Sequence, residues 1–345
     1  MNLEDEILNC HTTTDRSDRK DLITTWEEKE IDRSEVKEVF SVIFRTRGCS
    51  WSYLGGCSMC GYYTDTNPDI KDEDLEKQLD EALDRYNDQP IVKIYTSGSF
   101  FDEREVSGNI AEKILDRFDS EKTLIESRPE FIKKKKLKDF SELTDRRLEV
   151  AIGLESSQDF VLKRCINKGF TFDSYKRAVK RVKDVDGLVR TYLLLKPPFL
   201  TEREAIQDTL KSIDKVSNKS DIISINPVNV QRGSLVEHLW YRNVYRPPWL
   251  WSLIQVIKKA SLDTTLVSSK AGLGSDRGPH NCGDCDYDII DKIDQFNLTQ
   301  DKSVLDEVST DCGCKTKWEK EKEIGNYLFF RGDPGILSNR YAGYI

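Results

Sequence analysis

The sequence predicts an α/β protein, an incomplete (β/α) barrel of six or seven parallel strands followed by a small cysteine-containing region. Short apolar runs alternate with segments of helical periodicity, the order of elements that a parallel sheet requires. Chemically reactive side chains follow several of these runs, as they do at the carboxyl ends of barrel strands. After about Leu262 the alternation stops, and serine, glycine, aspartate and cysteine predominate.

The predicted barrel lies between two segments of different composition. We expect an N-terminal extension over residues 1–37, the barrel over 38–262 and a C-terminal metal-binding domain over 263–345. The expected strands are short and apolar, and they cover 39–44, 91–95, a run ending at Glu126, 148–156, 188–195, 222–226 and 264–267. The expected helices cover 72–87, 201–216 and 248–260. A barrel with so few strands is open on one side, where a large substrate can enter.

Three cysteines follow the first predicted strand in the spacing C-x7-C-x2-C. Cys49, Cys57 and Cys60 lie in a loop rich in glycine, which reaches tight backbone conformations at little cost. Three thiolates can hold a four-iron cluster and leave one iron without a protein ligand, whereas zinc needs a fourth ligand that this loop lacks. The alternatives are three ordinary buried cysteines, or half of a zinc site completed from elsewhere in the chain.

Further motifs follow the next three predicted strands. Thr96–Asp102 is a polar loop with a glycine, Glu126–Glu130 has the sequence Glu-Ser-Arg-Pro-Glu, and Gly153–Ser156 has the sequence Gly-Leu-Glu-Ser, followed by a helix and turn over Leu162–Thr171. Together with the cysteine loop, these motifs resemble those of the radical S-adenosylmethionine (SAM) enzymes. The x7 spacing is longer than usual, and Met59 stands where an aromatic residue is usual, which indicates a divergent branch.

The resemblance implies that the three cysteines bind a [4Fe-4S] cluster, that SAM occupies the open iron, and that SAM is cleaved to methionine and a 5′-deoxyadenosyl radical. The residues that we expect to bind this cofactor are Tyr62, Ser97, Gly98, Ser99, Glu126, Arg128, Glu155, Lys196 and Asn226. Lys196 and Asn226 are included because each ends a predicted strand, where an ammonium suits a carboxylate and an amide suits hydrogen bonding. A solvated loop charge is the alternative for Lys196.

From about residue 35 onward, the chain is also similar to a narrower family, the radical SAM proteins of archaeosine biosynthesis. The stretches that resemble its signatures are 47–57, 195–200, 226–231, 245–249 and 277–285. Membership implies that a partner enzyme first joins lysine, through its side-chain nitrogen, to a 7-cyano-7-deazaguanine base in tRNA. The radical enzyme, a lyase, then cleaves the lysine carbon–nitrogen bond and leaves archaeosine. The alternative is another Elp3-like or methylthiotransferase-like tRNA-modifying enzyme, which should carry an extra domain that we do not find.

Four cysteines of the C-terminal region form two close pairs, Cys282 with Cys285 and Cys312 with Cys314. Such pairs are typical of one metal ion held by four thiolates, and we favour zinc over an auxiliary iron–sulfur cluster. His280 is a candidate replacement ligand or an ordinary surface histidine. Unbound surface thiols are one alternative. A zinc-dependent nucleic-acid-binding module without catalysis is another, but it leaves the three-cysteine loop unexplained.

The formal net charge of −8 argues against attraction of nucleic acid by the protein as a whole, so tRNA must bind at a local basic surface. Lys133–Lys138 is the densest basic run, either a tRNA contact or a solvated helix face. The first thirty residues contain no run that suits a signal peptide, and no run approaches the length of a membrane span. We therefore expect a cytoplasmic enzyme whose partners are tRNA and the lysine-transferring subunit, with no membrane.

Overall fold

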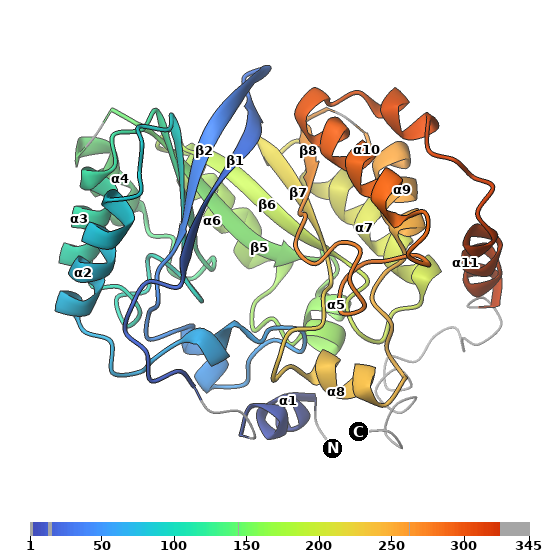
Figure 1. Cartoon of the computed structure of the whole chain (residues 1–345). Helices are drawn as coiled ribbons and strands as arrows, with labels where there is room; N and C mark the ends of the chain where they lie inside the picture. Colours follow the sequence, from blue (N-terminus) through green and yellow to red (C-terminus); the bar gives the residue numbers. More distant parts are fainter. Residues whose placement is uncertain (1–2, 13–15, 144, 262, 325–345) are drawn as a thin grey trace.

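Eight strands form one curled sheet in the computed structural model of this chain, which describes residues 3–12, 16–143, 145–261 and 263–324 (Figure 1). The strands lie side by side in chain order, β2 to β8 run parallel, and β1 pairs antiparallel with β2. Their bounds are β1 Thr24–Asp32, β2 Glu35–Ile43, β3 Ile91–Tyr95, β4 Lys122–Glu126, β5 Arg147–Glu155, β6 Leu188–Leu195, β7 Ile222–Pro227 and β8 Thr265–Ser268. Because β1 and β8 remain the two edges, the sheet is a half-barrel.

Helices cover the outer face of the sheet, with α2, α3 and α4 along one side and α7, α9 and α10 along the other (Figure 1). The helices are α1 Leu3–Thr12, α2 Asp72–Leu83, α3 Gly108–Arg117, α4 Lys134–Leu143, α5 Asp159–Val161, α6 Phe172–Lys183, α7 Glu202–Val216, α8 Leu235–Tyr241, α9 Leu250–Lys259, α10 Asp286–Thr299 and α11 Gly313–Ile324. The apolar core fills the space between these helices and the strands. Within the described ranges, no helix is long and apolar enough to cross a membrane.

The predicted fold class is confirmed, and seven parallel strands lie where apolar runs were expected. Strand β1 was not predicted, because its residues, TTWEEKEID, include four consecutive charged side chains and no apolar run. Both β1 and β8 belong to the sheet although they lie outside the range 38–262. The division into domains stays a prediction, and residues 325–345 of the predicted C-terminal domain lie outside the described residues.

The missed strand β1 completes a buried group of charges inside the amino-terminal half of the barrel. This charged cluster consists of Glu28, Glu30, Asp32, Lys93, Lys122, Arg147, Glu149 and Arg190. Lys122 is fully buried, and its Nζ lies 2.8 Å from Asp32 Oδ1 and 3.0 Å from Glu149 Oε2. Burial opposes ionisation of Asp32, but hydrogen bonds from Arg147 and Lys122 lower its pKa to about 2. The acidic face of β1 therefore belongs inside the barrel.

Candidate active site

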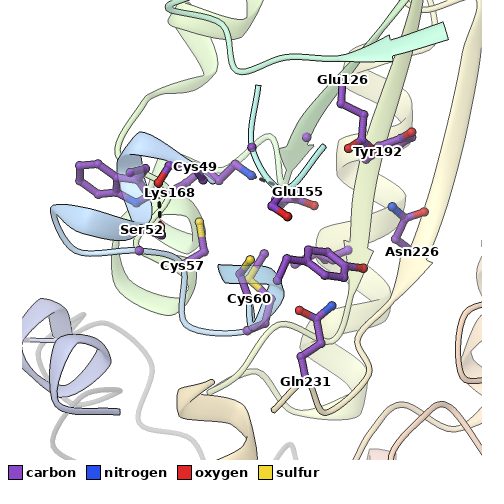
Figure 2. Close-up of a pocket in the computed structure, with 18 of the residues that line it drawn as sticks. Cys49, Ser52, Cys57, Cys60, Glu126, Glu155, Lys168, Tyr192, Asn226 and Gln231 are labelled. Carbon is purple, nitrogen blue, oxygen red and sulfur yellow. Dashed lines mark hydrogen bonds and ion pairs between the residues drawn. The ribbon is translucent and has the colours of Figure 1, made fainter. Parts of the chain in front are cut away.

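The three-cysteine loop crosses the carboxyl ends of the strands and is held there by other elements (Figure 2). Trp51 Nε1 donates to the carbonyl of Asn167 at 2.8 Å, and the amide of Ser58 donates to the carbonyl of Ile166 at 2.9 Å. The amide of Gly61 donates to Gln231 Oε1 at 2.7 Å. Bonds to the segments after β5 and β7 thus fix the loop from both sides.

Two glycines allow the loop to approach its neighbours closely. Gly48 has a φ of +89°, in the left-handed region that favours glycine. A Cβ atom on Gly98, in the loop after β3, would lie 2.5 Å from the Cα of Cys49. No larger residue fits at Gly98 without moving the cysteine loop away from β3.

Cys49, Cys57 and Cys60 line a cavity of about 240 Å³ at the carboxyl ends of the strands (Figure 2). The other expected cofactor residues that line this cavity are Tyr62, Ser97, Gly98, Glu126, Arg128, Glu155 and Asn226. Residues from β2, β3, β4, β5 and β7 or the loops that follow them therefore meet at one place, although they are far apart in the sequence. Parallel strands bring this about because their carboxyl ends share one edge of the sheet.

Two expected residues, Ser99 and Lys196, do not line the cavity. Ser99 Oγ accepts a hydrogen bond from the amide of Arg128 at 3.1 Å, so it supports a residue that does line the cavity. The ammonium of Lys196 forms an ion pair with Glu202 Oε2 at 2.5 Å, and its carbonyl accepts a bond from Tyr245 Oη at 2.8 Å. Lys196 thereby joins the end of β6 to α7 instead of facing the cavity.

The lining residues that were not expected from the sequence include His11, Lys168, Tyr192 and Gln231. Lys168 Nζ lies 2.7 Å from Glu155 Oε1, so the acid of the Gly-x-Glu-Ser motif is already paired (Figure 2). The backbone of Ser52 lies near the His11 ring, but neither ring nitrogen has a well-formed hydrogen bond with a described residue. Lys168 lies within the Leu162–Thr171 motif and Gln231 within the stretch 226–231, so both carry a local signal, whereas His11 and Tyr192 carry none.

The ionisable groups of this cavity are strongly perturbed. Burial raises the pKa of Cys60 to about 12 and also raises the pKa values of Cys49 and Cys57. The three groups are therefore protonated thiols near neutral pH, and metal binding must displace their protons. Burial also raises the pKa of Glu126 to about 7, although a hydrogen bond from Tyr192 opposes the shift. Perturbed acids gathered in one cavity are typical of a functional site.

A second cavity of about 590 Å³ adjoins the first inside the half-barrel. The residues that line both cavities are Tyr62, Thr96, Ser97, Glu126, Tyr192, Asn226, Ser269 and Ala271. From this common wall the second cavity extends between β1 and the segment formed by β8 and α10. A molecule in the second cavity would therefore face the contents of the first.

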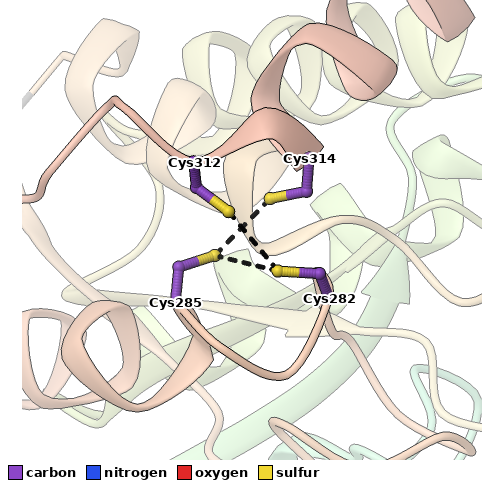
Figure 3. A group of neighbouring side chains, drawn as sticks. All are labelled: Cys282, Cys285, Cys312 and Cys314. Carbon is purple, nitrogen blue, oxygen red and sulfur yellow. Dashed lines mark hydrogen bonds between the residues drawn. The ribbon is translucent and has the colours of Figure 1, made fainter.

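The four late cysteines meet at a separate place, outside the barrel (Figure 3). Cys282 and Cys285 precede α10, and Cys312 and Cys314 lie at the start of α11. The Sγ atoms of these four residues all lie within 4.8 Å of one another, with separations of 3.4, 3.5 and 3.9 Å for three of the pairs. His280 instead bonds through Nδ1 to the carbonyl of Gly278 at 2.7 Å. The four sulfurs form a group that can hold a metal ion.

The half-barrel and the three-cysteine cavity define the class of this protein. The family model of the radical SAM superfamily matches residues 43–213, which include the cysteine loop and the motifs at the strand ends. This protein is a radical SAM enzyme.

Two relatives narrow the assignment. The archaeosine synthase subunit beta of Methanosarcina acetivorans is 40% identical over 85% of this chain and 87% of that protein. The subunit of the same name from Thermococcus kodakarensis is 38% identical over 82% of this chain and 91% of that protein. The chain belongs to the archaeosine synthase subunit beta family. Among solved structures, a queuine lyase from Clostridium spiroforme bound to SAM and queuine is 23% identical and covers 58% of this chain and 78% of its own, with a TM-score of 0.44.

Membership of the superfamily implies a [4Fe-4S] cluster and SAM, and the donor set of the first cavity fits them. Three thiols from one loop face the cavity, and no fourth cysteine among the described residues lines it. Three thiolates leave one iron of a four-iron cluster open.

Proposed function

We propose that this protein cleaves the side-chain carbon–nitrogen bond of a lysine adduct of 7-cyano-7-deazaguanine in tRNA and leaves archaeosine on the tRNA. The names of the two relatives support archaeosine as the product. The observation that carries the proposal is the pair of adjoining cavities, one lined by three thiols and the other large enough for a substrate group. Because the same residues line parts of both cavities, a radical formed in the first cavity would meet a substrate group in the second without passing through solvent.

The chain's own residues bind and orient the reactants. We assign Cys49, Cys57 and Cys60 to a [4Fe-4S] cluster, which with SAM would supply a radical that removes a hydrogen atom from the carbon beside the amidine nitrogen. The residues that we assign to SAM binding are Tyr62, Ser97, Gly98, Glu126, Arg128, Glu155 and Asn226. Ser99 positions Arg128 through its backbone, and Lys196 holds the end of β6.

The four late cysteines are proposed to bind zinc. Sulfurs at about 2.3 Å from a tetrahedral ion lie about 3.8 Å from one another, close to the separations of 3.4 to 3.9 Å between these side chains. A cubic four-iron cluster would hold its thiolates much farther apart. Trp251 Nε1 donates to Cys314 Sγ at 3.2 Å and Asn281 Nδ2 donates to Cys285 Sγ at 3.4 Å, which suits thiolates.

Two partners follow from the proposal, a lysine-transferring subunit and tRNA. The name "subunit beta" of the relatives supports a complex with another subunit. For tRNA, the Lys133–Lys138 run is the candidate surface, because Leu137 and Phe140 bury one face of α4 while Lys133, Lys134 and Lys135 remain exposed. A substrate of this kind also places the reaction in the cytoplasm.

The decisive test is turnover of the lysine-modified tRNA. Reconstituted protein is incubated without oxygen with SAM, a reductant and tRNA that carries the lysine adduct, and the nucleosides are analysed by mass spectrometry. We expect loss of the adduct and formation of archaeosine with wild-type protein, and neither with the Cys57→Ala variant. Cleavage of SAM without any change in the adduct would contradict the proposal.

A further inference from the structure

We propose that the second cavity binds the α-ammonium and α-carboxylate groups of the substrate's lysine moiety, through Asp294 and Lys270. This inference rests on the proposed function, since it gives the larger cavity a substrate group. Asp294 lies on α10 and Lys270 in the segment that follows β8, and both line the second cavity.

Asp294 has an unused acceptor. Its Oδ2 atom lies 3.0 Å from Lys270 Nζ, while its Oδ1 atom is buried and has no hydrogen-bond partner among the described residues. A buried carboxylate oxygen without a donor is costly, so such atoms in native proteins normally have a partner. An ammonium group of a ligand supplies the missing donors and the opposite charge.

Lys270 offers the complementary group. Its ammonium has three donors, its side chain is 59% exposed, and Asp294 is its hydrogen-bond partner. The remaining donors can bind a carboxylate beside the ammonium on Asp294. A zwitterionic head would then form a ring of four alternating charges with this pair.

Two buried cations that line the second cavity, Lys93 and Arg190, are already committed. Lys93 pairs with Glu28 and Glu30 at 2.7 Å each, and Arg190 pairs with Glu30 at 2.6 Å, all within the charged cluster. Recruiting either cation would break a buried ion pair, which costs several kcal/mol. The pair of Asp294 and Lys270, at the edge of the cavity, can accept a ligand without that loss.

The position of Lys270 also suits the reaction. Its neighbours Ser269 and Ala271 line both cavities, so the lysine lies one residue from the common wall. Adjacent Cα atoms are about 3.8 Å apart. We infer that a lysine moiety bound at Lys270 and Asp294 extends towards the residues that line both cavities.

An aromatic surface in the second cavity suits the methylene groups of the lysine moiety. Trp26 and Tyr95 line it and stack on each other, with ring centroids 5.7 Å apart and planes inclined by 6°. Trp26 is 36% exposed, although it lies on a strand whose other side chains are mostly paired. An aliphatic chain laid on this aromatic surface would bury it.

The test compares the Asp294→Asn variant with Asp291→Asn, a matched control on the exposed side of the same helix and outside the cavity. Binding of adduct-bearing tRNA to the loaded enzyme is measured without reductant, and kcat and KM with reductant. We expect Asp294→Asn to weaken binding and raise KM by roughly tenfold to a hundredfold, the range for a lost charged hydrogen bond. The control should match wild type, and all three proteins should unfold at the same temperature.

Altered substrates identify the group that is recognised. An adduct of 6-aminohexanoate lacks the α-ammonium, and an adduct of 1,5-diaminopentane lacks the α-carboxylate. The binding affinity of wild-type enzyme should fall on the first adduct by the same factor by which Asp294→Asn lowers affinity for the lysine adduct. The affinity of the Asp294→Asn variant should be the same for both adducts. The 1,5-diaminopentane adduct should bind wild type as weakly as the lysine adduct binds Lys270→Ala, and Lys270→Ala should bind the two adducts equally.

The outcomes separate this inference from the proposed function. The inference alone would be overturned if wild type converts the lysine adduct but Asp294→Asn has an unchanged KM and still distinguishes the lysine adduct from the 6-aminohexanoate adduct. Failure of wild type to convert the lysine adduct would overturn both.

Discussion

The two ends of the half-barrel treat polar groups in opposite ways. At the amino-terminal end, the charged cluster matches four acidic with four basic side chains, and Asp32 titrates below its ordinary range. At the carboxyl-terminal end, three thiols and Glu126 titrate above theirs, and neither ring nitrogen of His11 has a well-formed hydrogen bond with a described residue. Polar groups whose partners are all present hold the fold, whereas groups without partners mark the place of a ligand.

Loss of a cysteine at the carboxyl-terminal end should have the largest effect. Replacement of Cys57 by alanine should reduce SAM cleavage to less than about a thousandth of wild type, because the cluster loses a ligand, while the fold remains. Iron content, visible absorption and SAM cleavage measure the effect. The control is Cys165→Ala, a buried cysteine outside the cavity, which should keep its iron. Normal SAM cleavage by the Cys57 variant would refute the ligand assignment.

The four-cysteine site should behave as a complete set of ligands. Replacing Cys282 and Cys285 together by serine should remove about one zinc ion and lower the unfolding temperature by several degrees, because metal binding there contributes to folding. The iron of the first site should stay. Metal analysis and thermal unfolding test this. About four extra irons in wild type, and no zinc, would make the site an auxiliary cluster.

At the amino-terminal end we expect a loss of stability with a characteristic pH dependence. Asp32→Asn should lower the free energy of unfolding at pH 7 by on the order of 1 to 3 kcal/mol. The folded-state pKa of Asp32 is about 2 and its ordinary value is 3.8, so this stability is present above about pH 4 and is lost as the pH falls towards 2. Urea unfolding of wild type and variant should converge over that range. A difference that does not vary with pH would argue against the ion pairs as its source.

At the carboxyl-terminal end the sign should be reversed. The pKa of Glu126 rises from 4.5 to about 7 on folding, so wild type loses stability as the pH rises through this interval. In cluster-free protein, the free energy of unfolding of Glu126→Gln should therefore rise relative to that of wild type between pH 4.5 and 7, by on the order of 2 kcal/mol. Above pH 7 the difference should stay constant. Urea unfolding at pH 5, 6, 7 and 8 measures the difference. Equal pH profiles would show that the folded state leaves this carboxyl in water.

The two ends were also unequally predictable from the sequence. The site at the carboxyl-terminal end could be predicted because each motif directly follows an apolar strand, and parallel strands bring their ends together. The ion pairs of the charged cluster could not be predicted, since Glu30 on β1 meets Lys93, Lys122 and Arg190 from three other strands. His11 escaped for the same reason, because only the tertiary fold brings α1 to the cavity.

The bonds that hold the three-cysteine loop have a consequence for how the enzyme matures. Trp51 and Ser58 are bonded to the segment after β5 and Gly61 to the segment after β7, and none of these bonds requires iron. The loop is therefore tied to the rest of the polypeptide by bonds that do not pass through the cluster. We expect protein made without iron or sulfide to accept a cluster afterwards without first unfolding.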